Sequence, residues 1–240
     1  MSESDLSGHL DEVARSTDRL LESVDRLTEA DVRGPSLLPG WTRAHVLTHL
    51  ARNADGLAEL AAAARAGAAG EMYPGGAAAR AAAIEAGAER GLGDLRLDLG
   101  ESAERLLGAF VPDFPAAARE SQQALLSGTP LRGWEIPLIR LQEVEIHHVD
   151  LDAGYTTLDW PEAFVTRTLD RCSAQVRPRG DVPVAHLSRT DGTGSWQVGP
   201  GDTTLSGPAS ELLAWLTGRS TGAGLSLDSG QDVPPAPRWS

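Results

Sequence analysis

The sequence contains no lysine and only one cysteine, and each scarcity excludes a class of chemistry. Without lysine there is no amine for a Schiff base, no attachment point for pyridoxal and no P-loop lysine. A single thiol, Cys172, forms no internal disulfide and builds no multi-cysteine zinc or iron–sulfur site. All 21 basic residues are therefore arginines, and we interpret Cys172 as a small core residue.

Long apolar runs are also missing. No run approaches the roughly 20 residues of a membrane span, and no basic-then-apolar signal segment opens the chain. The 34 acidic residues outnumber the basic ones and give a net charge of −13, which repels phosphate backbones and anionic lipid. These features favour a soluble, cytoplasmic protein with no nucleic-acid partner and no membrane partner.

The spacing of apolar and turn residues predicts an α+β protein with two domains. Residues 1–157 are expected to form an antiparallel four-helix bundle, and Thr42 is a plausible N-cap of its second helix. A Gly/Ala-rich stretch over 66–90 leaves the start of the next helix undefined. Helical spacing predicts long helices over about 5–30, 43–66, 99–124 (with a proline interruption) and 136–152.

Residues 158–240 have a different pattern, which predicts a small α+β domain. Pro161 suits the first position of a helix that runs to about Gln175. Alternating residues then predict three short strands, and a closing helix over about 208–216 ends at Gly218. The strands are expected over 182–187, 195–198 and 203–206.

Pairs of metal-ligating residue types lie on two of the predicted helices. His45 and His49 are four residues apart on the second helix, and Glu143 and His147 are four apart on the fourth. An i,i+4 spacing places both side chains on one helical face. If the two helices face each other, one histidine of the first pair completes a His/His/Glu set. Three protein ligands and one open position are what catalytic zinc requires.

The same spacing has a simpler explanation. A histidine pair on a helix is often solvated or hydrogen-bonded, and Glu143 with His147 fits a helix-surface ion pair. A zinc protease is disfavoured, because Val46 stands where such enzymes place a glutamate after the first histidine. Spacing alone leaves the metal site and the ion pair open.

Longer motifs resemble a known family. The run LPGWTRAHVLTHLA at 38–51 and the run EVEIHHVDL at 143–151 resemble the mycothiol-dependent maleylpyruvate isomerase family, which belongs to the DinB-like four-helix-bundle metalloenzymes. The run AWLTGR at 214–219 is similar to the end of that family's small C-terminal domain. The resemblance therefore extends over the whole chain.

The resemblance implies roles for particular residues. His49, Glu143 and His147 would hold Zn²⁺ or another divalent metal. Asp150 would orient the imidazole of His147, and His45 would support the site without binding the metal. His148 would serve packing or hydrogen bonding, and Trp41 would anchor the second helix.

The resemblance also implies a reaction, the conversion of maleylpyruvate to fumarylpyruvate in gentisate breakdown. Reversible addition of a thiolate makes the double bond single, allows rotation and then reverses; mycothiol would be the thiol cosubstrate. A dicarboxylate substrate requires cations, which in this chain must be arginines. Arg219 is the candidate for a catalytic and substrate-binding arginine, and Arg80 is a second substrate-binding candidate.

Two other functions remain open. One is a mycothiol S-transferase that uses the same site on another electrophile. The other is a non-catalytic, zinc-binding regulatory module, for which a closed four-ligand site is expected. For the quaternary structure we expect a monomer or a small homo-oligomer.

Overall fold

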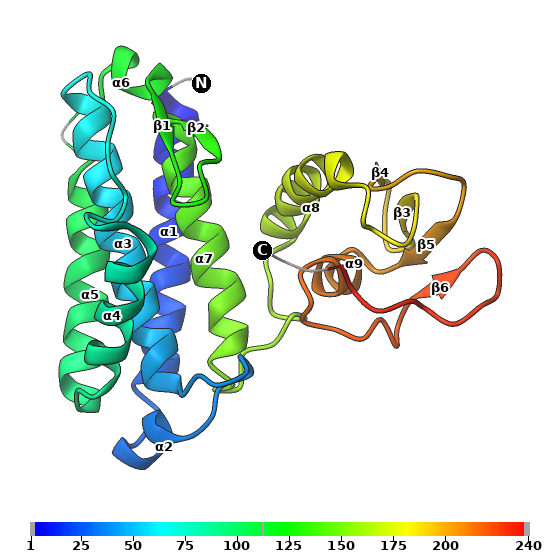
Figure 1. Ribbon diagram of the computed structural model, residues 1–240, viewed down its shortest axis with the longest axis horizontal. Coiled ribbons are helices and arrows are strands. Elements are labelled where there is room, and N and C mark those ends of the chain that lie inside the picture. Colours follow the sequence, from blue (N-terminus) through cyan, green and yellow to red (C-terminus); the bar gives the residue numbers. More distant parts are fainter. Residues whose placement is uncertain (1–2, 112, 238–240) are drawn as a thin grey trace. The chain divides into compact units, whose positions relative to one another are not determined.

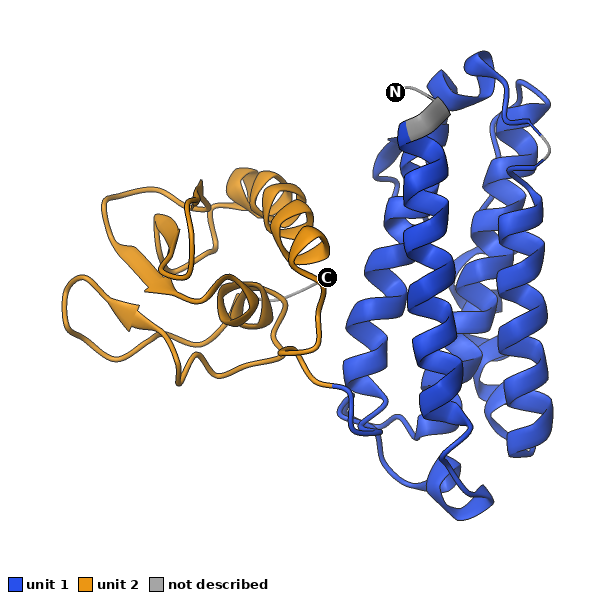
Figure 2. Cartoon of the chain, turned by 180° about the vertical axis from the view of Figure 1, so that it is seen from behind, with its two compact units in different colours: residues 1–155 blue, residues 156–240 orange. Residues whose placement is uncertain are grey.

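Two compact units make up the chain, residues 1–155 and residues 156–240 (Figure 2). The computed structural model describes residues 3–111 and 113–237. The first unit is mainly helical and the second combines helices with a four-stranded sheet, so the predicted α+β class is confirmed. Among the described residues, no helix is both long enough and apolar enough to span a bilayer.

The first unit is built on four long helices (Figure 1). They are α1 (Glu3–Val24), α3 (Arg43–Arg65), α5 (Leu92–Gly108) and α7 (Ile136–Asp150). Shorter elements connect them: α2 (Glu29–Arg33), α4 (Gly76–Ala88), α6 (Ala116–Glu120), the antiparallel hairpin of β1 (Gln122–Ala124) and β2 (Pro130–Arg132), and the 3-10 turn η1 (Gly133–Glu135).

The directions of the long helices differ from the simple antiparallel bundle that the sequence suggested. α3 and α7 are antiparallel, since Arg43 donates to the Leu151 carbonyl and Arg140 to that of Leu50. α3 and α5, in contrast, run parallel, with Arg52 bonded to Asp98 and Arg65 to the Ala109 carbonyl. The antiparallel expectation is therefore wrong for this pair. The parallel direction results from α4, which runs antiparallel to α3. The chain is therefore back near the start of α3 when α5 begins.

Two of the predicted helices also have different limits. The first ends at Val24 and is followed by the separate α2, whereas one helix over 5–30 was expected. The third, expected over 99–124, spans Leu92–Gly108 and is followed by α6 and β1. Gly93 and Gly100 disfavour a helix and have no neighbouring atoms that a side chain could contact. The burial of Leu95 and Leu99 stabilises the helix in spite of these glycines. Pro112, where an interruption was expected, lies outside the described residues.

Two apolar clusters fill the bundle, and a polar layer separates them. On α3, one cluster ends at Leu50 and the other begins at Ala54; on α7, one ends at Ile139 and the other begins at Val144. Between these levels each long helix buries a polar side chain; the four are Thr17, Asn53, Ser102 and Arg140. Because buried polar groups are costly without partners, this layer is the natural place to look for a site.

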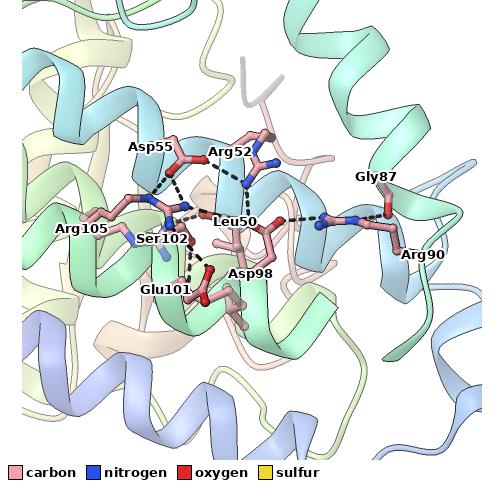
Figure 3. A network of polar contacts seen from close by, with 11 residues as sticks. Leu50, Arg52, Asp55, Gly87, Arg90, Asp98, Glu101, Ser102 and Arg105 are labelled. Atoms are coloured by element: carbon pink, nitrogen blue, oxygen red, sulfur yellow. Dashed lines mark hydrogen bonds and ion pairs between the residues drawn. The ribbon is translucent and has the colours of Figure 1, made fainter. Parts of the chain in front are cut away.

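A network of ion pairs joins α3, α4 and α5 (Figure 3). Asp98 of α5 accepts from Arg52 of α3 at 2.6 Å and from Arg90, just after α4, at 2.7 Å. Arg90 also donates to the carbonyl of Gly87 near the end of α4, at 3.0 Å. Asp55 extends the network to Arg105 of α5 at 2.8 Å. The connection made by α4 is thereby fixed to both long helices that it joins.

We predict that Asp98→Asn destabilises the protein by roughly 1–3 kcal/mol, because both arginines then lose a charge-assisted hydrogen bond in a partly buried position. The measurement is the free energy of unfolding in urea. Glu104→Gln, at an exposed position of the same helix, is the control and should change this free energy by less than about 0.5 kcal/mol. Equal effects of the two substitutions would show that the network contributes nothing specific.

The second unit contains a mixed sheet and two main helices. Its strand order is β4-β3-β5-β6, with β3 and β5 parallel and the outer pairs antiparallel. The strands are β3 (His186–Arg189), β4 (Ser195–Gln197), β5 (Thr204–Gly207) and β6 (Ser226–Leu227). The helices are α8 (Glu162–Val176), followed by the 3-10 turn η2 (Arg177–Arg179), and α9 (Ala209–Leu216). Pro161 precedes α8 as its N-cap.

Candidate metal centre

The start of α3 is defined by a capping box. The Thr42 side chain accepts from the backbone N–H of His45, and the His45 ring accepts at Nδ1 from the backbone N–H of Thr42. The other ring nitrogen of His45 lies 3.3 Å from Glu85 of α4. Trp41 stacks on His45, and its ring centroid is 5.7 Å from that of His49. His45 therefore helps to cap the start of α3, and the ring of Trp41 contacts both His45 and His49.

Three side chains from α3 and α7 converge one turn further along. His49 Nε2 lies 3.0 Å from Glu143 Oε2, and His147 Nε2 lies 3.5 Å from the same oxygen. One ligand atom from each of the three residues lies within 4.8 Å of the other two. The antiparallel contact of α3 and α7 thus brings together the His/His/Glu set that the two i,i+4 spacings suggested.

Asp150 supports this set from the next turn of α7. Its Oδ2 lies 2.8 Å from His147 Nδ1, and its side chain is 2% exposed. A carboxylate accepts hydrogen bonds, so Nδ1 of His147 carries a proton and donates it. The Nε2 atom of His147, 3.5 Å from Glu143 Oε2, is then the ring nitrogen left for a metal, which would take the place of the proton on that atom.

The charges of the three residues depend on one another. Burial favours the neutral form of Glu143, yet hydrogen bonds from His147 and His49 outweigh it and hold the pKa of that carboxyl well below its usual value. Burial, followed by the nearby His147, lowers the pKa of His49 to about 4. Burial opposes the charged form of His147 too, but Asp150 and Glu143 outweigh it and raise its pKa. Near neutral pH the centre therefore holds an ionised carboxylate and a neutral His49.

Two arginines surround this centre. Arg80 of α4 places Nη2 2.9 Å from His49 Nδ1, and its guanidinium lies over the ring of Tyr73, 5.6 Å from the centroid. Arg140 of α7 is fully buried and donates through Nη1 to the Leu50 carbonyl and to Asn53. Among the described residues its Nε and Nη2 have no hydrogen-bond partner. Burial lowers the pKa of Arg140 to about 10, with Glu143 acting in the opposite direction.

Sequence reasoning missed Arg140 and Tyr73. Arg140 precedes Glu143 by three residues, and this spacing places both on one helical face; the signal was therefore present. Tyr73 lies in the Gly/Ala-rich stretch over 66–90, which gave no such signal. Its position depends on Gly56 of α3, because a Cβ at this residue would lie 2.5 Å from the backbone oxygen of Met72. Only glycine therefore allows the backbone that precedes Tyr73 to approach α3 this closely.

The remaining candidates belong to other elements of the chain. Arg219 belongs to the second unit, in the turn after α9, where Nη1 donates to the Thr217 carbonyl at 2.6 Å. His148 is buried on another face of α7; it is bonded to Ser23 of α1 and stacked on Tyr155. Cys172 is fully buried in α8, consistent with a core residue.

The donor set suits a divalent cation. Two imidazoles and a carboxylate are ligands that zinc and similar metals accept, and catalytic zinc sites keep three protein ligands. The ring of His147 is already oriented by the hydrogen bond from its Nδ1 to Asp150. The structure thus defines a four-helix-bundle protein with a candidate metal centre between two of its long helices.

Comparison with known proteins agrees with this class. Residues 13–152 match the family described as "Mycothiol maleylpyruvate isomerase N-terminal domain", and residues 159–238 match the "MDMPI C-terminal domain". The chain belongs to the mycothiol-dependent maleylpyruvate isomerase family, which confirms the resemblance noted in the sequence.

Solved structures give the same result. A crystal structure of the mycothiol-dependent maleylpyruvate isomerase is 27% identical, with a TM-score of 0.90, and the match covers 98% of this chain and 97% of that chain. A mutant of that enzyme, with one histidine replaced by alanine, is 26% identical with the same TM-score and coverage. No curated protein sequence matches the chain.

We predict that Asp150→Ala weakens metal binding about 10–100-fold, because His147 loses the partner that orients its ring. The dissociation constant for Zn²⁺ is measured by competition with a chromophoric chelator. Glu85→Gln is the matched control: it also changes a carboxylate bonded to a histidine, but that histidine is His45, and affinity should not change. If Glu85→Gln weakens binding as much as Asp150→Ala, His45 takes part in the centre.

A second prediction concerns Cys172, whose pKa burial raises to about 12. At pH 8 only about one native thiol in 10⁴ is ionised, so iodoacetamide should label the native protein far more slowly than the urea-unfolded chain. The unfolded thiol ionises near pH 8.5, below the folded one. Cys172 therefore contributes stability that is complete below about pH 8.5 and declines as the pH rises toward 12. Equal labelling rates of both states would contradict the burial.

Proposed function

We propose that this chain catalyses the mycothiol-dependent cis–trans isomerisation of maleylpyruvate to fumarylpyruvate, a step of gentisate breakdown, with zinc as its metal. The observation that carries the proposal is the convergence of the buried His49 with the partly buried Glu143 and His147. Family membership and the two similar crystal structures support the same reaction. The enzyme would act in the cytoplasm, where small thiols are kept reduced.

The chemistry requires a nucleophile that adds to a double bond and then leaves. The chain's own thiol, Cys172, is buried in α8 with a raised pKa, and the sequence has no lysine. A thiol from outside, mycothiol, fits this composition. A divalent metal held by the three ligands would lower the pKa of a thiol that binds at its open position.

The isomerisation needs no net proton transfer. The thiolate adds to one carbon of the double bond, and the electron pair moves to the oxygen of the conjugated carbonyl. Rotation about the resulting single bond follows, the electron pair returns, and the thiolate leaves from the trans product.

The chain's own residues would bind and orient the reactants. Asp150 keeps the ring of His147 in one orientation through the 2.8 Å hydrogen bond. The guanidinium of Arg80, next to His49, is placed to pair with a substrate carboxylate, and Arg219 of the second unit is proposed for the other carboxylate. Arg219 would also stabilise charge that develops on the substrate oxygen.

The two alternative functions require different properties of the metal centre. A regulatory zinc module needs a closed set of four ligands, whereas the His/Cys/Asp/Glu cluster found among the described residues has three members. A mycothiol S-transferase would use the same centre with another electrophile, and only turnover separates it from an isomerase. Substrate identity therefore decides between the two enzymes.

The direct test gives the zinc-loaded protein maleylpyruvate with and without mycothiol and follows the ultraviolet absorbance of the substrate. We expect turnover only when mycothiol is present, because the chain has no available thiol. Fumarylpyruvate is identified by chromatography. A stable mycothiol adduct in place of fumarylpyruvate would support a transferase, and no reaction at all would refute the isomerase assignment.

Variants of the ligands test the metal centre itself. His49→Ala, Glu143→Ala and His147→Ala should each lose bound zinc and reduce kcat by at least about 10³-fold, because three-ligand sites do not tolerate the loss of one ligand. His45→Ala is the matched control, four residues from His49 on the same helix; it should retain zinc. Zinc content is measured by atomic emission after dialysis. The assignment within the first histidine pair is wrong if His45→Ala loses zinc and His49→Ala keeps it.

A further inference from the structure

Arg80 makes an unusual contact with a candidate metal ligand. Its Nη2 lies 2.9 Å from Nδ1 of His49. A guanidinium carries only donors and stays protonated, so Nδ1 of His49 must accept the hydrogen bond. The ring proton then sits on Nε2, which donates to Glu143 Oε2 at 3.0 Å. Both nitrogens of the buried His49 ring are occupied in this arrangement.

Metal binding is incompatible with this contact, whichever nitrogen takes the metal. If the metal binds Nδ1, it uses the lone pair that now accepts from Arg80. If it binds Nε2, the neutral ring carries its proton on Nδ1, and an N–H of His49 points at an N–H of Arg80. Two donors cannot share one hydrogen bond. In both cases Arg80 must leave His49.

We propose that Arg80 and the metal compete for His49, so that metal binding releases the guanidinium to pair with a carboxylate of the substrate. This inference rests on the proposed metal centre. In the metal-free protein, Arg80 holds the His49 ring in place. In the metal-loaded protein it becomes a cation with unoccupied donors beside the centre, so the anion site is completed only after the metal has bound.

The surroundings of Arg80 allow such a movement. Its side chain is only partly buried, and its guanidinium lies over the ring of Tyr73, a contact that does not require the hydrogen bond to His49. Gly87 fixes α4 against α3, because a Cβ there would overlap the Thr48 side chain. The backbone beneath Arg80 can therefore stay in place while the guanidinium turns. A carboxylate suits a planar fork of donors better than other anions of similar size.

The coupling must be reciprocal. Removing Arg80 should strengthen metal binding, since the metal then displaces no charge-assisted hydrogen bond and meets one positive charge fewer. We expect the dissociation constant for Zn²⁺ to fall roughly tenfold in Arg80→Met. Arg80→Gln should behave in the same way, because an amide can either donate to Nδ1 or accept from it.

The experiment is a competition titration with Zn²⁺ and a chromophoric chelator on the full chain. The control Arg15→Met removes a positive charge at an exposed position of α1 and should leave the affinity unchanged. Thermal melting checks that each variant is folded. Wild-type protein that binds no Zn²⁺ would overturn the metal centre together with this inference. Zn²⁺ binding in the wild type with no gain in either Arg80 variant would overturn only the competition.

Two further readouts separate competition from a general charge effect. Maleate, a cis dicarboxylate, should tighten Zn²⁺ binding to the wild type and do so several-fold less in Arg80→Met, as linkage requires. The ¹⁵N shifts of the His49 ring should show an unprotonated Nδ1 in the metal-free wild type and a changed state of that nitrogen when Zn²⁺ is bound. Equal maleate effects in both proteins, or an Nδ1 that carries a proton without metal, would refute the proposal.

Discussion

A charged carboxylate in the middle of a helical bundle is stable only if cations and donors surround it, and this requirement shapes the first unit. Glu143 lies between α3 and α7 with hydrogen-bonding contacts to His49 and His147, and the buried Arg140 lies three residues before it. An isolated buried charge would cost several kcal/mol. Arg140 belongs to the polar layer between the two apolar clusters, whereas His49 and His147 lie at the level of the cluster that contains Leu50 and Val144.

The path of the chain through α4 follows from the same requirement. α3 and α7 supply the three candidate ligands, and a bundle of four helices alone would leave this centre without a cation on its outer side. Helix α4 runs back along α3 and brings Arg80 to His49, and the ion pairs around Asp98 fix it to α3 and α5 (Figure 3). What appears in the sequence as a weak Gly/Ala-rich connection therefore supplies a cation to the candidate centre.

The sequence predicted the long, strongly periodic elements and the convergence of His49 with Glu143 and His147. Thr42 was recognised as the N-cap of α3, and the capping box with His45 explains why. The direction of the α3–α5 pair could not be predicted, because it depends on α4, whose alanines and glycines have no amphipathic pattern. The contact between Arg80 and His49 was also invisible, since it joins residues 31 positions apart through the packing of Gly87 on Thr48. Arg140 carried a helical-spacing signal, but a buried guanidinium contradicts the usual exposure of arginine.

The absence of lysine and the sealed position of Cys172 have a consequence beyond the choice of an external thiol. A conjugated, electron-poor alkene alkylates whatever thiolate or amine it meets, and a protein that handles such a molecule in every cycle is exposed to covalent damage. This chain presents no lysine amine, and its one sulfhydryl lies in the core of α8, fully buried and protonated at physiological pH. The composition thus leaves the protein without a lysine amine or an exposed cysteine thiolate that could react with the electrophile that it is proposed to transform.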